Sequence, residues 1–102
     1  MNVSISDEAE LELKQAAQWY EDRVPALGGG FLDQILDALD DIAKHPGRYP
    51  REPGRHGREI RRLLLDRFPY SIVYEVIGRR VVVLAIAHTA RRPGYWKRRR
   101  AK

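Results

Sequence analysis

The stretch YSIVYEVIGRRVVVLAIAH, residues 70–88, decides the fold of this 102-residue chain. Its first eight residues alternate between the two faces expected of a half-buried strand. The Gly-Arg-Arg sequence at 78–80 predicts a tight hairpin turn. Residues 81–88 are apolar at nearly every position, as expected for a strand buried on both faces in the middle of a sheet. The stretch therefore predicts a hairpin whose second strand is central.

The alternation also predicts how the first of these strands faces. Four side chains should point toward covering helices: Tyr70, Ile72, Tyr74 and Val76. Ser71 and Glu75 should point to the other side, with Val73 between them. A further strand over residues 59–65 should precede this one, joined to it through residues 66–69.

Two predicted helices lie upstream of the strands. Ser6 is suited to cap a helix over residues 7–24, in which apolar residues recur at helical spacing. A second helix over residues 31–44 has its own apolar stripe and follows a short flexible connector at residues 26–30. Because the link is so short, the helices should pack as an antiparallel hairpin. Residues 1–5 alternate and predict a short initial strand.

Together these elements predict one α+β domain over residues 1–102, in the order β-α-α-β-β-β. The helix hairpin should cover one face of an antiparallel sheet, and the other face should be partly open. Residues 48–57 are rich in Pro, Gly and Arg and should form a loop. Residues 97–102 should form a basic, flexible tail.

The residue types exclude several kinds of site. The chain has no cysteine, so it has neither a disulfide framework nor a thiolate metal site. Its three histidines, His45, His56 and His88, lack the short spacings of zinc sites, and we expect no metal and no cofactor. No apolar run reaches the roughly 20 residues that span a bilayer, and the N-terminal residues do not resemble a secretory signal. We therefore expect a cytoplasmic protein that makes no membrane contact.

Charge is distributed unevenly along the chain. Residues 1–50 carry four basic and ten acidic side chains, a net charge of −6. Residues 51–102 carry fifteen basic and four acidic side chains, a net charge of +11. A basic half of this size attracts nucleic acid or an acidic protein, and the charge alone does not distinguish them.

The residues that follow the central strand form the first candidate site. They are His88, Arg91, Arg92, Tyr95, Trp96 and Lys97. A histidine can transfer a proton near neutral pH, arginines neutralise phosphates, and aromatic rings can stack on unpaired bases. The alternative is structural, because basic ends are often solvated tails and Tyr-Trp after Pro-Gly often folds back to cap a core.

Arg61 and Arg62 form a second candidate site. They occupy neighbouring positions of a predicted strand, so they should point to opposite faces of the sheet. One of them should add a cation to the partly open face. The alternative is again structural, since an arginine stem often covers apolar surface.

Several stretches across the chain lie in a characteristic order. They are Trp19-Tyr20-Glu21, the helix beginning at Phe31, Ile60-Arg61-Arg62-Leu63, Phe68-Pro69-Tyr70-Ser71-Ile72-Val73-Tyr74, and Ala87-His88-Thr89-Ala90-Arg91-Arg92-Pro93-Gly94-Tyr95-Trp96. This combination resembles the RelE/ParE superfamily of bacterial type II toxins over essentially the whole chain. The resemblance implies a helix hairpin on an antiparallel sheet, and an antitoxin that wraps and blocks the toxin.

The resemblance also implies two alternative mechanisms. RelE-like members cleave mRNA in the ribosomal A site without a metal, whereas ParE-like members inhibit DNA gyrase. Arg91 and Arg62 match basic positions of the nuclease pattern, and His88 resembles a histidine that other ribosome-dependent members use as an acid or base. Ser71 stands where RelE has an arginine, and Leu64 where it has a lysine. Lys97 aligns with the terminal RelE tyrosine, for which Tyr95 lies near enough to substitute.

From the resemblance we expect the toxin of a type II toxin–antitoxin module that arrests growth and serves plasmid stabilisation. If it is a metal-independent endoribonuclease, His88, Arg91 and Tyr95 should be its catalytic residues. Residues that bind nucleic acid or another target should be Arg61, Arg62, Arg92, Trp96 and Lys97. An acidic amphipathic antitoxin segment should cover the face that carries Ser71 and Glu75, or the helix hairpin, in a heterotetramer or larger complex. The alternative is a non-catalytic basic module that binds nucleic acid or protein and retains the toxin fold.

Overall fold

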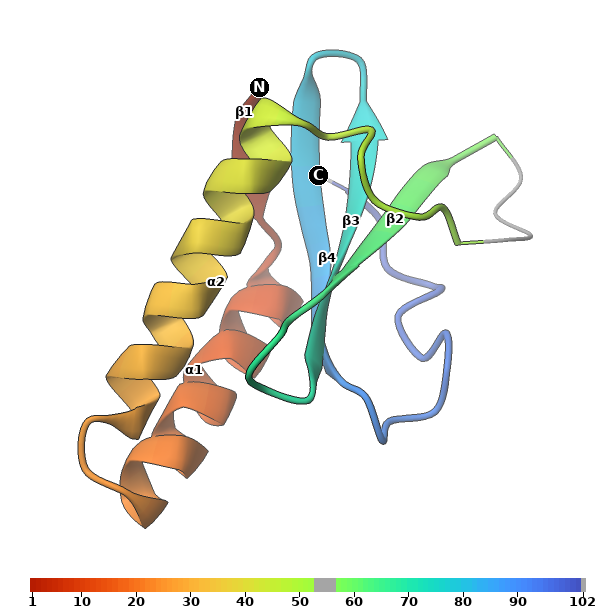
Figure 1. The fold of residues 1–102 in the computed structure, drawn as a ribbon. Helices are drawn as coiled ribbons and strands as arrows, with labels where there is room; N and C mark the ends of the chain where they lie inside the picture. The colour runs from red at the N-terminus through yellow and green to blue at the C-terminus, as the bar shows by residue number, and fades with distance from the viewer. Residues whose placement is uncertain (53–56, 102) are drawn as a thin grey trace.

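The computed structural model describes residues 1–52 and 57–101, and its elements follow the predicted order (Figure 1). They are β1 (Asn2–Ile5), α1 (Asp7–Arg23), α2 (Leu27–Lys44), β2 (Glu59–Leu64), β3 (Tyr70–Ile77) and β4 (Arg80–His88). Two predicted segments extend beyond the described residues, namely the loop at 48–57 and the tail at 97–102. Within the described ranges, no helix is long and apolar enough to cross a membrane.

The four strands form one sheet in the order β1-β4-β3-β2, so β4 is an interior strand, as predicted. Strands β2, β3 and β4 are antiparallel, but β1 pairs parallel to β4, with Val3 opposite Val81. The sheet is therefore mixed, rather than antiparallel throughout. Figure 1 shows the reason: α1 continues in the direction of β1, and α2 returns the chain to its starting end. The three later strands then leave β4 running in the same direction as β1.

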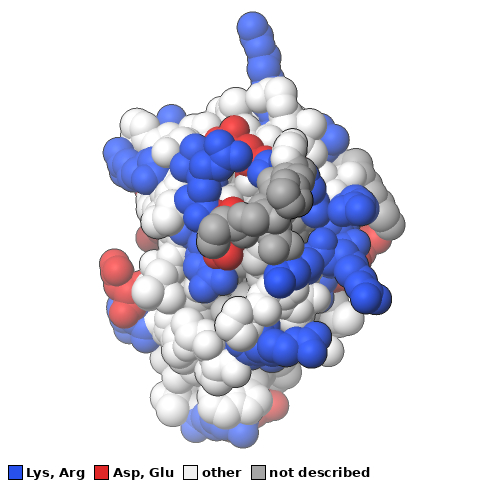
Figure 2. All heavy atoms as spheres, turned by 90° about the vertical axis from the view of Figure 1, so that its right-hand side faces the viewer, with Lys and Arg blue, Asp and Glu red and all other residues white. Residues whose placement is uncertain are grey.

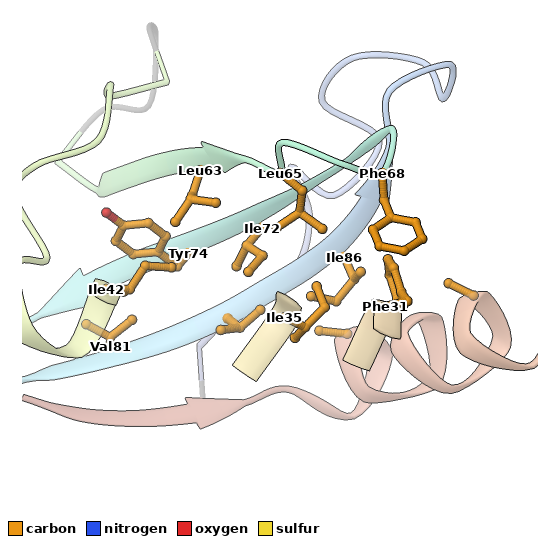
Figure 3. Close-up of a cluster of buried hydrophobic side chains, with 13 residues drawn as sticks. Phe31, Ile35, Ile42, Leu63, Leu65, Phe68, Ile72, Tyr74, Val81 and Ile86 are labelled. Atoms are coloured by element: carbon orange, nitrogen blue, oxygen red, sulfur yellow. The ribbon is translucent and has the colours of Figure 1, made fainter. Parts of the chain in front are cut away.

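Both faces of the sheet are covered with buried side chains. Between the helices and the sheet, Phe31, Ile35 and Ile42 of α2 pack with Ile72 and Tyr74 of β3 (Figure 3). The opposite face has a second cluster, made of Ile60, Val73, Val82, Leu84, Ala85, Ala87 and Trp96. These memberships confirm the predicted facing of β3. The pairing of β3 with β4 shifts register after Val73, which accounts for two successive β4 residues in the second cluster.

The sheet face away from the helices was predicted to be partly open, but it is covered. The chain after β4, residues 89–101 and hereafter the C-terminal segment, lies along the side of the sheet opposite the helices (Figure 1). Beneath it Ser71 is 2% exposed and Glu75 is 7% exposed. In the isolated chain, the face that was predicted for an antitoxin is therefore occupied by the chain's own end. The predicted alternative surface, the helix hairpin, remains exposed.

The connector between the helices also differs from the prediction. Helix α2 begins at Leu27, so the three glycines lie inside its first turn rather than in a flexible link. Ala26 precedes it in the left-handed region, with φ of 72°, and offers no side-chain cap. Instead the Glu21 carboxylate of α1 accepts the backbone N–H groups of Ala26 at 2.9 Å and Gly28 at 3.0 Å. A capping carboxylate from the neighbouring helix thus satisfies helix donors that would otherwise lack a partner.

Gly28 is required by the close approach of the two helices. A Cβ atom at this position would lie 2.5 Å from the Ala17 carbonyl oxygen. The neighbouring Gly29 would meet nothing within 4 Å. Because Gly28 has no side chain, the start of α2 can pack directly against α1, next to the Glu21 carboxylate.

Candidate target-binding site

An open groove of about 750 Å³ lies between α1 and the ends of β3 and β4. Its lining includes Glu12, Gln15, Trp19, Tyr70, His88 and Arg91. Trp19 is 51% exposed, and the Arg23 guanidinium lies over its ring at 3.4 Å from the centroid. An exposed aromatic ring beside cationic side chains is typical of a surface that binds another macromolecule.

His88 lies at one wall of this groove, at the end of β4. Its Nδ1 accepts the Ala90 backbone N–H at 2.9 Å, and its ring packs edge-on against Tyr70, 5.0 Å between centroids. Because a backbone N–H can only donate, the neutral ring carries its proton on Nε2. His88 is therefore set to donate from Nε2, while the lone pair of Nδ1 is already engaged.

A second, small pocket of about 50 Å³ lies on the other side of His88. Arg62, Arg91 and Arg92 line it together with Ser71. The structure therefore brings three predicted arginines to one position beside the His88 imidazole, and Arg91 and Arg92 are exposed there. A concave site with three guanidinium groups suits a small anionic group.

The two neighbouring arginines of β2 point to opposite sides, as predicted. Arg61 is only 17% exposed at its side chain, and it donates to Glu59 at 2.8 Å and to the Tyr49 carbonyl at 2.7 Å. Its guanidinium group is therefore engaged in contacts within the fold. Arg62 is 40% exposed, and its Nε lies 2.7 Å from Oε1 of Glu52, an ion pair at the rim of the small pocket.

Tyr95, predicted as catalytic, is bound to α1. Its hydroxyl donates to Oε2 of Glu12 at 2.6 Å. Burial, and after it the hydrogen bond to Glu12, raises the pKa of the Tyr95 phenol above its ordinary value. The guanidinium groups of Arg91 and Arg99 lie over its ring, at 3.9 Å and 5.1 Å from the centroid. A phenol held in this way does not ionise readily, and its ring already contacts two guanidinium groups.

Trp96 was predicted to contact a target, but its side chain is 2% exposed. It packs in the second cluster, against residues of β2, β3 and β4. The structural alternative considered from the sequence, an aromatic side chain that folds back to cap the core, is the one observed. Lys97 is exposed beside it, and its side chain packs over Gly94, which adopts φ of 76°.

Two largely buried ion pairs hold the C-terminal segment in place, and neither was predicted. Glu12 accepts from Arg99 Nη1 at 2.9 Å and Nη2 at 3.2 Å, and also from the Ile86 backbone N–H at 3.0 Å. On the far side Arg58 binds Glu75 at 2.7 Å and donates to the carbonyl oxygens of Lys97 and Arg99. The flexible tail expected from residue 97 onward is instead held to the sheet and to α1 through Arg99.

Glu12 shows why these contacts were missed. Helical spacing places Glu12 among the polar residues of α1, yet its carboxylate accepts hydrogen bonds from β4 and from the C-terminal segment, where Arg99 lies 87 residues further along the chain. Helical periodicity assigns a residue to a face, but it does not show what a distant segment brings to that face.

Cationic side chains gather on the side of the molecule opposite the helices. Figure 2 shows this side, on which Lys and Arg spread widely and few Asp or Glu appear. The C-terminal segment contributes five exposed cations: Arg91, Arg92, Lys97, Arg98 and Arg100. The charge difference between the two halves of the chain is therefore also a difference between two faces.

Comparison with known proteins agrees with this fold. Residues 3–93 match the family model described as the ParE toxin of the type II toxin-antitoxin system, parDE. A solved structure titled "Chromosomal ParDE TA system from P. aeruginosa" is similar at a TM-score of 0.73 and 19% sequence identity, over 86% of this chain and 95% of that chain. At this identity the likeness establishes a shared fold. A search of curated proteins gave no match.

Proposed function

Because the chain belongs to the ParE toxin family of type II toxin–antitoxin systems, we propose that it arrests growth by binding DNA gyrase and that an antitoxin restrains it. Inhibition of gyrase is what the resemblance to ParE-like members implies. The proposal makes the protein a binding toxin rather than a nuclease.

The state of Tyr95 is the observation that carries this choice. Cleavage by attack of a 2′-hydroxyl requires a base, an acid and cationic charge stabilisation at one place. The Tyr95 phenol is bound to Glu12 and its pKa is raised, so it is unsuited to act as a base. The lone pair of His88 Nδ1 is occupied by the Ala90 N–H, and position 71 holds a buried serine rather than a cation.

The groove along α1 supports a protein target. Trp19 is half exposed there, with Arg23 stacked on it, and His88 and Arg91 form the opposite rim. Aromatic and arginine side chains are the residue types that contribute most to protein interfaces. We assign the groove as the surface that contacts gyrase.

One observation favours the second candidate, cleavage of ribosome-bound mRNA. His88, Arg91 and Arg62 surround the small pocket, where a phosphate group would meet a proton donor and two cations. This candidate requires a proton acceptor in addition, and the ribosome or the substrate would have to supply it.

Expression in cells separates the two candidates. We would induce the chain without a partner, map mRNA 5′ ends by primer extension and measure plasmid supercoiling in the same cultures. The proposal expects intact mRNA and relaxed plasmid. New codon-periodic ends that vanish in His88→Ala and Arg91→Ala would overturn it, and unchanged growth would favour a binding module without toxicity.

The restraining antitoxin has one exposed surface left among the two predicted for it. The Ser71 and Glu75 face is buried, whereas the helix hairpin exposes Leu11 at 56% and Leu36 at 63%. The hairpin also carries most of the acidic residues, so we propose an amphipathic antitoxin segment that binds there through apolar contacts. Hydrogen exchange of the isolated toxin and its complex would locate the segment, and protection confined to the C-terminal segment would contradict this assignment.

A further inference from the structure

We infer that the exposed cations of the C-terminal segment bind the backbone of double-stranded DNA without reading its sequence. The five side chains are Arg91, Arg92, Lys97, Arg98 and Arg100, and together they are named the basic face. This inference goes beyond the proposed function, which concerns a protein target, and it rests on different observations.

The charge of the basic face is not compensated internally. Within residues 1–52 and 57–101, none of its five side chains has a carboxylate oxygen within 4.0 Å. Glu12 and Glu75 are bound by Arg99 and Arg58, which also contact the C-terminal segment or belong to it. Because these two partly buried arginines neutralise Glu12 and Glu75, the positive charge of the basic face is not offset by them.

The remaining negative charge lies elsewhere. Apart from Glu12, helices α1 and α2 carry nine of the chain's fourteen acidic side chains, and the two helices lie on the opposite side of the sheet from the C-terminal segment. A polyanion is therefore repelled by one side of the molecule and attracted by the other, which orients it on the basic face.

The aromatic residues distinguish a duplex from a single strand. Binding of unpaired nucleotides depends on aromatic faces on which bases stack. Trp96 is buried, and Tyr95 has the guanidinium groups of Arg91 and Arg99 over its ring. The basic face thus offers cations without a stacking platform, which favours contacts to phosphates of an intact duplex.

The cations are also held in place before any ligand arrives. The Arg58 guanidinium donates to the backbone carbonyls of Lys97 at 3.4 Å and Arg99 at 3.0 Å, and Trp96 anchors the segment in the second cluster. A fixed backbone lowers the entropy lost on binding, in contrast to a disordered basic tail.

Gyrase itself acts on DNA, so a toxin that bound both gyrase and DNA would act where the enzyme meets its substrate.

Fluorescence anisotropy with a labelled 30-base-pair DNA duplex of arbitrary sequence tests the inference. If all five cations contact phosphates, raising salt from 50 to 200 mM weakens binding roughly 500-fold. The triple variant Arg92→Ala/Lys97→Ala/Arg98→Ala leaves two contacts, so its loss over the same range falls to about 12-fold. The matched control Lys14→Ala/Lys44→Ala/Arg79→Ala removes the same charge from the helices and the hairpin turn, and it should keep the original salt dependence.

Three outcomes would overturn the inference. The first is an equal salt-dependent loss of DNA affinity in the two triple variants. The others are tighter binding of a single-stranded 30-mer, or of an RNA duplex of the same sequence, than of the DNA duplex. Circular dichroism checks that each variant is folded, and none of the six substituted side chains is buried. The binding assay contains no gyrase. A failure here is therefore distinguishable from a failure of the proposed function, which a supercoiling assay on the same preparations would show.

Discussion

The hydroxyl of Tyr95 donates a 2.6 Å hydrogen bond to Glu12, and this contact joins the end of the chain to its first helix. The same carboxylate binds Arg99 and the Ile86 N–H. One side chain therefore ties together α1, β4 and the C-terminal segment, next to the groove. Because Tyr95 and Arg99 are engaged by Glu12, their side chains are not free to contact a target.

Removing the Glu12 carboxylate should destabilise the fold. Glu12→Ala leaves Arg99 largely buried without its partner, and we expect a loss of about 2–4 kcal/mol in the free energy of unfolding, somewhat below the range for a fully buried pair. Urea unfolding measures it. Glu10→Ala is the control, because its pair with Lys14 is exposed and should contribute less than about 0.5 kcal/mol. Equal effects of the two substitutions would contradict the assigned role of Glu12.

Tyrosine ionisation should weaken the fold at alkaline pH. Burial raises the pKa of Tyr74 to about 12, and burial followed by the Glu12 hydrogen bond raises that of Tyr95. The folded state thus holds these protons more tightly, so their contribution is complete below pH 10 and is lost as pH rises through the folded values. Urea unfolding between pH 9 and 11.5 should show a steeper decline for the parent than for Tyr95→Phe. Parallel curves would refute the link.

The helix contact at Gly28 makes a paired prediction. Gly28→Ala should cost about 1–3 kcal/mol, because the new Cβ atom would meet the Ala17 carbonyl at 2.5 Å. Gly29→Ala, one residue along, meets nothing within 4 Å and should be neutral or stabilise by up to about 1 kcal/mol. Thermal unfolding of the two variants compares them directly, and the reverse order would mean that the helices do not approach at Gly28.

The two tryptophans should separate stability from target binding. Trp96→Ala empties a buried position and should cost about 3–5 kcal/mol. Trp19→Ala, at a half-exposed position, should change stability by less than about 1 kcal/mol but raise the toxin concentration needed to inhibit gyrase at least ~10-fold, as expected for an interface hot spot. Unfolding curves and a supercoiling titration give the two readouts. A Trp19→Ala toxin of full potency would remove the groove from the proposed interface.

The sequence predicted those parts of the fold that depend on local pattern. The apolar run before His88 identified an interior strand, and the alternation from Tyr70 assigned its neighbour's faces correctly. Periodicity does not encode strand direction, so the parallel pairing of β1 with β4 was not predicted. The three glycines predicted a flexible connector. They lie instead in the first turn of α2, where Glu21 of the other helix caps the helix start.

For the candidate site, the sequence predicted which residue types gather there, but it did not predict which of their side chains are free to contact a target. His88, Arg91 and Arg92 do lie together beside one small pocket. Tyr95 and Trp96 have the same residue types as a stacking site, yet Glu12 holds one and the sheet buries the other. Both outcomes depend on contacts between residues distant in the sequence, which spacing along the chain does not reveal.

The most direct test of the central claim, that this toxin acts by binding gyrase, is a supercoiling assay with purified gyrase, relaxed plasmid and increasing toxin. We expect supercoiling to stop in the presence of the toxin, and His88→Ala to raise the toxin concentration required without changing the kind of effect. Undiminished supercoiling at saturating toxin, with ribosome-bound mRNA cleaved in a parallel reaction, would contradict it.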